Sequence, residues 1–155
     1  MTGRRLRAIG AGDLRGVVAL EATIFGDAWS EAAFRDFLAL EHIHGIVAED
    51  VEGHLVGYAV CSSAADEGEI LNLAVAEEVR GAGTGAALLE ASVAWLAGRG
   101  AANVYLEVRR SNVAAIAMYH GAGFATVSVR RGYYRMPTED AVVMALALGA
   151  RSAQK

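Results

Sequence analysis

The chain has 155 residues, of which 54% are hydrophobic and 21% charged, and its formal net charge is −4 at neutral pH. This length suits a single core, and the negative balance excludes a general nucleic-acid binder, which needs a basic surface. No stretch approaches the roughly 18 uninterrupted apolar residues of a membrane span. We therefore expect a single domain over residues 1–149, followed by a polar tail at 150–155.

The first half of the chain predicts strands and helices in mixed order. The pattern favours a strand over 4–9, helices over 13–25 and from Ser30 onward, and a hairpin of strands over 45–48 and 54–61. Asp13 and Ser30 are expected to cap the two helices, because both side chains can accept hydrogen bonds from free backbone N–H groups. In the hairpin turn, Gly53 supplies the unusual backbone angles.

The second half continues with the same alternation. It predicts a strand over 69–75, a helix over 86–96, a strand over 104–108, a helix over 112–120, and closing strands over 124–131 and 141–148 around the loop RGYYRMPTED. The order β α α β β β α β α β β, without repeats or a linker, indicates an α/β (α+β) fold in which helices cover both faces of a mixed sheet.

Two features bear on the cellular compartment. The N-terminus, MTGRRLRAIG, lacks the apolar run of a signal peptide. Cys61 is the only cysteine, which excludes an internal disulfide framework and a clustered thiolate metal site and agrees with a reducing compartment. We therefore expect a cytoplasmic protein.

The glycine-rich segment RGAGTG at 80–85 is the sharpest local signal. Glycines just before a helix let the backbone approach a bulky anion, and the helix N-terminus turns free N–H groups toward it. Gly81, Gly83 and Ala86 satisfy the G-x-G-x-x-A pattern of dinucleotide sites, whereas coenzyme A also presents a pyrophosphate. A helix-entry turn without a ligand remains a third interpretation.

Context weakens the dinucleotide interpretation. Glu107 lies at a suitable distance downstream to contact a ribose. However, the polar segment 76–80 separates the glycines from the preceding strand, and the pattern stands in mid-chain without repeating βαβ units.

Four segments of the chain resemble a known family. The run ILNLAVAEEVRGAGTGAALLE is similar to the acetyl-CoA motif of the GNAT superfamily of N-acetyltransferases, and Arg80, Gly83 and Gly85 fit its loop pattern. AWSEAAF, LEVRRSNVAAIAMYHGAGF and VRRGYYRMPTEDAVVMAL resemble its RimI-like branch, which acetylates the N-terminal alanine of a ribosomal protein. Ala28 replaces a common proline, and AEEV replaces a usual Asp-Pro segment. The resemblance spans nearly the whole chain and implies the GNAT fold, with a mostly antiparallel sheet of about seven strands.

The resemblance implies a reaction and two catalytic residues. Acetyl-CoA would donate an acetyl group to a protein N-terminus, by direct transfer in a ternary complex. Glu107 falls on the general-base position and Tyr119 on the general-acid position. The residue types suit the chemistry, because an α-amino group with a reference pKa of about 7.7–8.0 needs only a mild base. A backbone N–H near Leu73 or Ala74 would stabilise the oxyanion.

The resemblance also implies two binding regions. The coenzyme would be held by backbone groups of Leu73, Ala74 and Val75, by the loop residues Arg80, Gly81, Ala82, Gly83, Thr84 and Gly85, and by Asn112. The acceptor groove would be lined by Trp29, Tyr133 and Tyr134, whose apolar bodies and polar tips suit a peptide end. No nucleic acid, membrane or metal is expected as a partner.

Each assignment has a structural alternative. Glu107 could pair with Arg109 or Arg99, Tyr119 could be a core aromatic, and Asn112 could serve only as a helix cap. The three groove aromatics could anchor their own loops. Cys61 could in principle carry an acetyl group, although cysteine in an apolar strand usually packs as a small hydrophobe. The four histidines lack metal-ligand spacing and are expected at the surface or in packing.

Alternative functions also follow from the sequence. A GNAT protein could instead acetylate a small-molecule amine or a lysine, or it could bind acetyl-CoA without catalysis.

Overall fold

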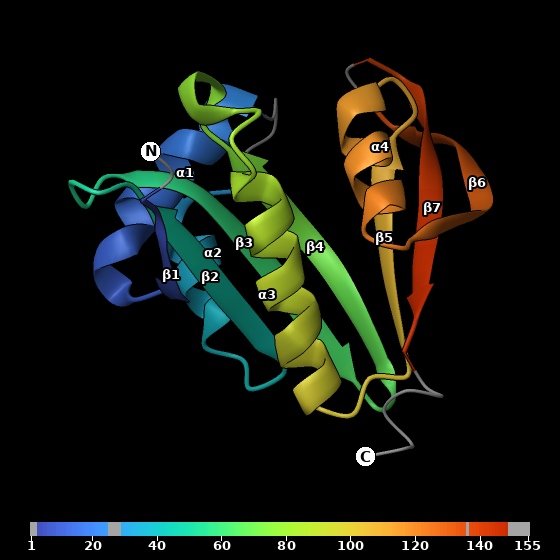
Figure 1. The fold of residues 1–155 in the computed structure, drawn as a ribbon, viewed down its shortest axis with the longest axis horizontal. Helices are drawn as coiled ribbons and strands as arrows, with labels where there is room; N and C mark the ends of the chain where they lie inside the picture. Colours follow the sequence, from blue (N-terminus) through green and yellow to red (C-terminus); the bar gives the residue numbers. More distant parts are fainter. Residues whose placement is uncertain (1–2, 25–28, 136, 149–155) are drawn as a thin grey trace.

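The computed structural model describes residues 3–24, 29–135 and 137–148. The elements are β1 (Arg5–Ala8), α1 (Leu14–Ile24), α2 (Glu31–Leu38), β2 (Ile43–Glu49), β3 (Leu55–Ala64), β4 (Glu67–Val75), α3 (Thr84–Gly98), β5 (Asn103–Arg109), α4 (Val113–Gly121), β6 (Ala125–Tyr134) and β7 (Glu139–Ala147), with 3-10 turns at Ala11–Asp13 and Glu77–Val79. Within the described ranges, seven strands form a sheet in the order β1-β2-β3-β4-β5-β7-β6 (Figure 1). Among the strand pairs of the described residues, only β4–β5 is parallel.

Helices cover both faces of this sheet, which confirms the predicted architecture. Tyr58 and Ala59 are neighbours on β3 and therefore point to opposite faces. Tyr58 packs in a cluster with residues of α1 and α2, whereas Ala59 packs against Leu88 of α3. Tyr119 of α4 shares a cluster with Leu89 and Leu96 of α3, so α3 and α4 lie on the same face of the sheet (Figure 1). A mostly antiparallel sheet differs from the parallel sheet that the dinucleotide interpretation requires.

Most predicted elements occur near their expected positions, with two corrections. Ser30 caps α2 as predicted, since its Oγ accepts a hydrogen bond from the Ala33 N–H at 3.1 Å. The Asp13 carboxylate does not cap α1. Instead it binds the Arg7 guanidinium at 2.8 Å and accepts from the Gly10 N–H at 2.7 Å. Residue 25, the last of the helix predicted over 13–25, and the tail at 150–155 lie outside the described residues.

The second correction concerns the loop between the closing strands. Strand β6 runs on to Tyr134, which pairs with Glu139 of β7. Tyr133 and Tyr134 therefore belong to the end of a strand and not to a loop, because the ladder resumes after an irregularity that follows Arg130.

Strands β4 and β5 pair along only part of their length. The ladder joins residues 67–70 of β4 to 103–106 of β5 and then stops. On its other side, β4 carries a bulge against β3, where Val60 faces Asn72 and Cys61 faces Ile70, so Leu71 is the additional residue. A bulge bends the strand that carries it, and beyond this point β4 diverges from β5 (Figure 1).

The core depends on close contacts between α3 and the sheet. Leu88, Leu89 and Leu96 of α3 are at most 1% exposed. Gly68 of β4 lies directly under Leu96, and a Cβ atom there would come within 2.8 Å of its Cδ1 atom. In the described ranges, no helix has both the length and the apolar character that crossing a membrane requires.

We predict that Leu88→Ala lowers the free energy of unfolding by about 2–5 kcal/mol, because it leaves a cavity between α3 and the sheet. Leu40→Ala is the matched control, since Leu40 is 45% exposed and should change stability by about 0.5 kcal/mol or less. Urea unfolding followed by circular dichroism measures both. Equal losses in the two variants would contradict this account of the core.

Candidate active site

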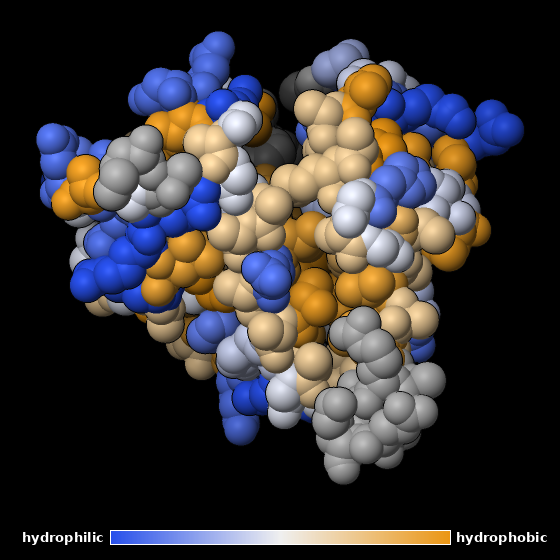
Figure 2. All heavy atoms as spheres, in the orientation of Figure 1, coloured by the Kyte–Doolittle hydropathy of each residue, from blue (hydrophilic) through white to orange (hydrophobic). Residues whose placement is uncertain are grey.

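A cavity of about 540 Å³ lies where β4 and β5 diverge. Its wall is formed by Glu21, Ile24 and Trp29, by residues 70–73 of β4, by residues 106–109 of β5, and by Ser111, Asn112, Tyr119, Tyr134, Pro137 and Glu139. Tyr119 belongs to the face covered by α3 and α4, whereas Glu21 belongs to α1 on the other face. Figure 2 shows apolar surface between α3 and α4 on the first of these faces. The divergence therefore opens a path between the two faces of the sheet.

The cavity brings together six of the residues that the sequence singled out. They are Trp29, Leu73, Glu107, Asn112, Tyr119 and Tyr134. Ala74, Val75, Tyr133 and the loop from Arg80 to Gly85 do not line it.

Glu107 points to the face opposite α4. Its neighbours on β5, Leu106 and Val108, are buried in the cluster beneath α3 and α4, and side chains alternate along a strand. The Glu107 carboxylate accepts a hydrogen bond from Arg130 Nη1 at 2.6 Å, and this contact raises the pKa of the arginine. The same carboxylate raises the pKa of Tyr133.

Glu107 forms an ion pair with neither of the two arginines that the sequence suggested. Arg109 instead binds Glu139 at 3.2 Å and lies over the ring of Tyr134 at 4.4 Å. Arg99 lies over the ring of Trp95. The salt bridge with Arg130 is largely exposed on the arginine side, at 55%, so breaking it costs little.

Tyr119 combines a packed ring with a place at the cavity wall. It is 7% exposed and packs against Phe124, with ring centroids 6.0 Å apart. Burial raises the pKa of its hydroxyl to about 12, so the hydroxyl keeps its proton at neutral pH. At the start of the same helix, Asn112 Oδ1 accepts from the Ala115 N–H at 3.2 Å, which confirms its capping role.

The glycine loop has the geometry of an anion site. Gly81 and Gly83 have φ angles of +85° and +87°, which side chains rarely adopt, and Gly83 is the N-cap of α3. Among the described residues, the N–H groups of residues 81–86 have no hydrogen-bond acceptor. Arg4 donates to the Ala82 carbonyl within the loop, and Arg80, its first residue, donates to the Val75 carbonyl at the end of β4.

The next two loop residues contribute packing. Thr84 is 4% exposed. A Cβ atom on Gly85 would come within 3.1 Å of Met118 Sδ, so this glycine lets the start of α3 lie close to α4.

Strand β4 offers an open edge beside the cavity. The Ala76 N–H donates to the Val56 carbonyl on β3, so in the alternating ladder the backbone groups of Ala74 also face β3. The backbone groups of Leu73 and Val75 then face the gap left by β5. Three residues were predicted to offer backbone groups to the coenzyme, and those of Leu73 and Val75 point toward the gap. The Val75 carbonyl already accepts a hydrogen bond from Arg80.

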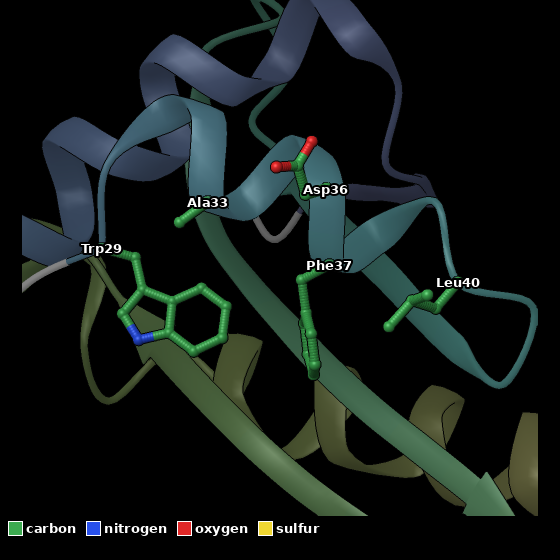
Figure 3. Close-up of a pocket in the computed structure, with 5 residues that line it drawn as sticks. All are labelled: Trp29, Ala33, Asp36, Phe37 and Leu40. Carbon is green, nitrogen blue, oxygen red and sulfur yellow. The ribbon is translucent and has the colours of Figure 1, made fainter.

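Trp29 lies between the cavity and a second groove. It is 39% exposed and packs against Phe34 and Phe37 of α2. The groove, about 540 Å³, is lined by Trp29, Ala33, Asp36, Phe37 and Leu40 along α2 (Figure 3). Trp29 thus anchors its own segment and also faces the cavity. Tyr133 is 44% exposed beneath Arg130.

Glu21 is a residue that sequence reasoning missed. It is 2% exposed on α1, lines the cavity, and accepts hydrogen bonds from the Tyr58 hydroxyl, Asn72 Nδ2 and the Trp29 N–H. The signal was present in the periodicity, because Leu14, Val17 and Glu21 share the buried stripe of one helix. A carboxylate on such a stripe requires hydrogen-bond donors.

Cys61 and the histidines lie outside the cavity wall. Cys61 is fully buried, and burial raises the pKa of its thiol to about 12, which disfavours the nucleophilic thiolate. His44 stacks on Trp95, and His120 Nδ1 lies 3.0 Å from the Phe124 carbonyl. His54 lies beside Asp50 and Glu52 at an exposed turn.

Known proteins resemble this chain along most of its length. Residues 14–124 match the model of the Acetyltransferase (GNAT) family. The ribosomal protein bS18-alanine N-acetyltransferase of Escherichia coli is 36% identical over 138 residues, which cover 86% of this chain and 90% of the relative. The N-alpha-acetyltransferase RimI of Mycobacterium tuberculosis is 38% identical over 143 residues, or 88% of each protein. The crystal structure of the Escherichia coli enzyme aligns with a TM-score of 0.84 at 33% identity, covering 93% of each chain.

Proposed function

Because the chain belongs to the acetyltransferase (GNAT) family, we propose that it transfers the acetyl group of acetyl-CoA to the N-terminal α-amino group of a protein. The observation that carries this proposal is the cavity at the divergence of β4 and β5, which Glu107 and Tyr119 line from opposite faces of the sheet. Two substrates that approach from opposite faces would meet there. By similarity to the relatives, the preferred acceptor is the N-terminal alanine of a small-subunit ribosomal protein, which would place the enzyme in the cytoplasm.

The residues present fit acetyl-CoA. The free N–H groups of residues 81–86 and the start of α3 suit a pyrophosphate. The open edge at Leu73 and Val75 would bind the amide groups of the pantetheine arm as an added strand does, and Asn112 lies beside it on the cavity wall. When bound, the coenzyme supplies an activated thioester.

The side chains at the cavity would then divide the proton transfers. Glu107 would accept a proton from the acceptor ammonium, directly or through water, and would exchange its contact with Arg130 to do so. The Leu73 N–H would stabilise the oxyanion that forms when the amine attacks the thioester carbonyl. Tyr119, which keeps its proton at neutral pH, would donate it to the sulfur as the carbon–sulfur bond breaks, and the second proton lost by the acceptor nitrogen would return to the Tyr119 oxygen. Cys61 takes no part, so the transfer is direct.

The first test is the release of coenzyme A from acetyl-CoA in the presence of a peptide panel. We expect rapid release with a peptide that begins with alanine, and none with an N-terminally blocked peptide that contains lysine. Peptides that begin with serine or methionine define the preference. Release with the blocked peptide would move the acceptor to lysine, and silence with every peptide would contradict protein N-terminal acetylation.

Glu107→Gln should lower kcat about 10²–10⁴-fold, since it removes the proposed base. Tyr119→Phe should lower kcat while leaving the affinity for acetyl-CoA unchanged, because only the hydroxyl is lost. Glu69→Gln is the matched control, as Glu69 is a neighbouring carboxylate on β4 and should retain activity within a few fold. Steady-state kinetics separate these cases. Full activity in Glu107→Gln would remove this residue from the mechanism.

The glycine loop can be tested with a matched pair of substitutions. Gly83 and Gly100 have φ angles of +87° and +93° at opposite ends of α3. Alanine at either position should cost about 1–2 kcal/mol of stability, because L residues resist this conformation. Only Gly83→Ala should also weaken the binding of coenzyme A, measured by calorimetry. Equal affinity in both variants would place the pyrophosphate elsewhere.

A further inference from the structure

Glu21 is a buried carboxylate that the chemistry above does not use. Within the described ranges, no arginine or histidine forms an ion pair with it. A buried charge is costly unless hydrogen bonds or an opposite charge compensate for it. Its position at 2% exposure therefore requires an explanation.

Hydrogen-bond donors surround this carboxylate. Oε1 accepts from the Tyr58 hydroxyl and from Asn72 Nδ2 at 3.0 Å, and Oε2 accepts from the Trp29 N–H at 3.1 Å. Amide N–H groups can donate but cannot accept. Each carboxylate oxygen thus faces a group that only donates.

These contacts connect two parts of the acceptor side. Trp29 precedes α2 and lines the cavity, and Asn72 precedes Leu73 on β4. Glu21 therefore ties the segment that carries the proposed acceptor-binding tryptophan to the strand that carries the proposed oxyanion N–H.

Glu21 also leaves the cavity with an unbalanced charge. Three carboxylates line its wall in the described part of the chain: Glu21, Glu107 and Glu139. Glu107 binds Arg130 and Glu139 binds Arg109, whereas Glu21 has only neutral donors. At neutral pH an acceptor α-amino group, with a reference pKa of about 7.7–8.0, arrives mainly as a cation. Attraction between the two charges is strengthened where water is excluded.

We propose that Glu21 is the positioning residue of the acceptor site. Its negative charge attracts the α-ammonium group of the acceptor, and its hydrogen bonds hold Trp29 and Asn72 at the cavity wall. This proposal rests on the proposed function, since it assumes a peptide acceptor with a free N-terminus.

Calorimetry with two peptides tests it. Both begin with alanine and share one sequence, but one has a free N-terminus and the other is N-acetylated and therefore uncharged there. With coenzyme A present, the unmodified protein should bind the free-amine peptide more tightly. Glu21→Gln should reduce this preference about tenfold, as expected for the loss of one charge attraction, while Glu21→Asp keeps the charge and most of the preference. Glu139→Gln should retain the preference, because Glu139 lines the same cavity but is already paired with Arg109.

Each other outcome has a clear meaning. Equal weakening of both peptides by Glu21→Gln, with the preference intact, would reduce Glu21 to a structural role and overturn the proposal. Loss of the preference in Glu139→Gln would also overturn it, even if Glu21→Gln did not fold. A protein that acetylates the alanine peptide but shows no preference for its charged form would contradict this inference alone. Absence of both binding and acetylation would contradict the proposed function as well.

Discussion

The divergence of β4 from β5 is the constraint on which the rest of the site depends. Two parallel strands that remained paired would satisfy each other's backbone groups and would close the sheet. Here the ladder ends after Ile70 and Leu106, next to the bulge at Leu71. The result is an open strand edge and a passage between faces that are otherwise separated by the sheet. Glu107 on one face and Tyr119 on the other can both border one cavity only because of this opening.

Charge is distributed unequally around that cavity. The carboxylates of Glu107 and Glu139 each have an arginine partner, and the arginine of the first pair is largely exposed. Such a pair can open at small cost, which suits a group that must exchange partners during a reaction. Glu21 is held instead by neutral donors from three separate segments. Glu21 is therefore held by more contacts than Glu107, which has a single exposed arginine partner.

The sequence was sufficient for the order of elements and for six residues that line the cavity. Periodicity and glycines located the strands, the helices and the glycine loop, and the resemblance selected Glu107 and Tyr119, whose roles stay a prediction. The partner of Glu107 was not predictable, because Arg130 reaches it from β6, two strands away in the sheet. The helix period places Glu21 on the buried stripe, but its hydrogen-bond donors were not predictable either. Its donors Tyr58 and Asn72 lie 37 and 51 residues away, and nothing in a local pattern reveals such contacts. Asp13 was mispredicted for a different reason, since Arg7 and Gly10, both close in sequence, outcompete the helix N–H groups for its carboxylate.

The open edge and the glycine loop belong to one continuous stretch, from Leu71 to Ala86, that leaves the sheet and enters α3. In the proposed complex, almost everything that this stretch presents to the coenzyme is main chain: the edge of β4, the N–H groups of the loop and the first turn of the helix. Recognition through main-chain atoms depends on backbone angles and leaves most side chains free to vary. Substitutions in the segment AEEV should therefore have little effect on coenzyme binding. Substitutions are restricted at Gly81 and Gly83, because their φ angles are positive.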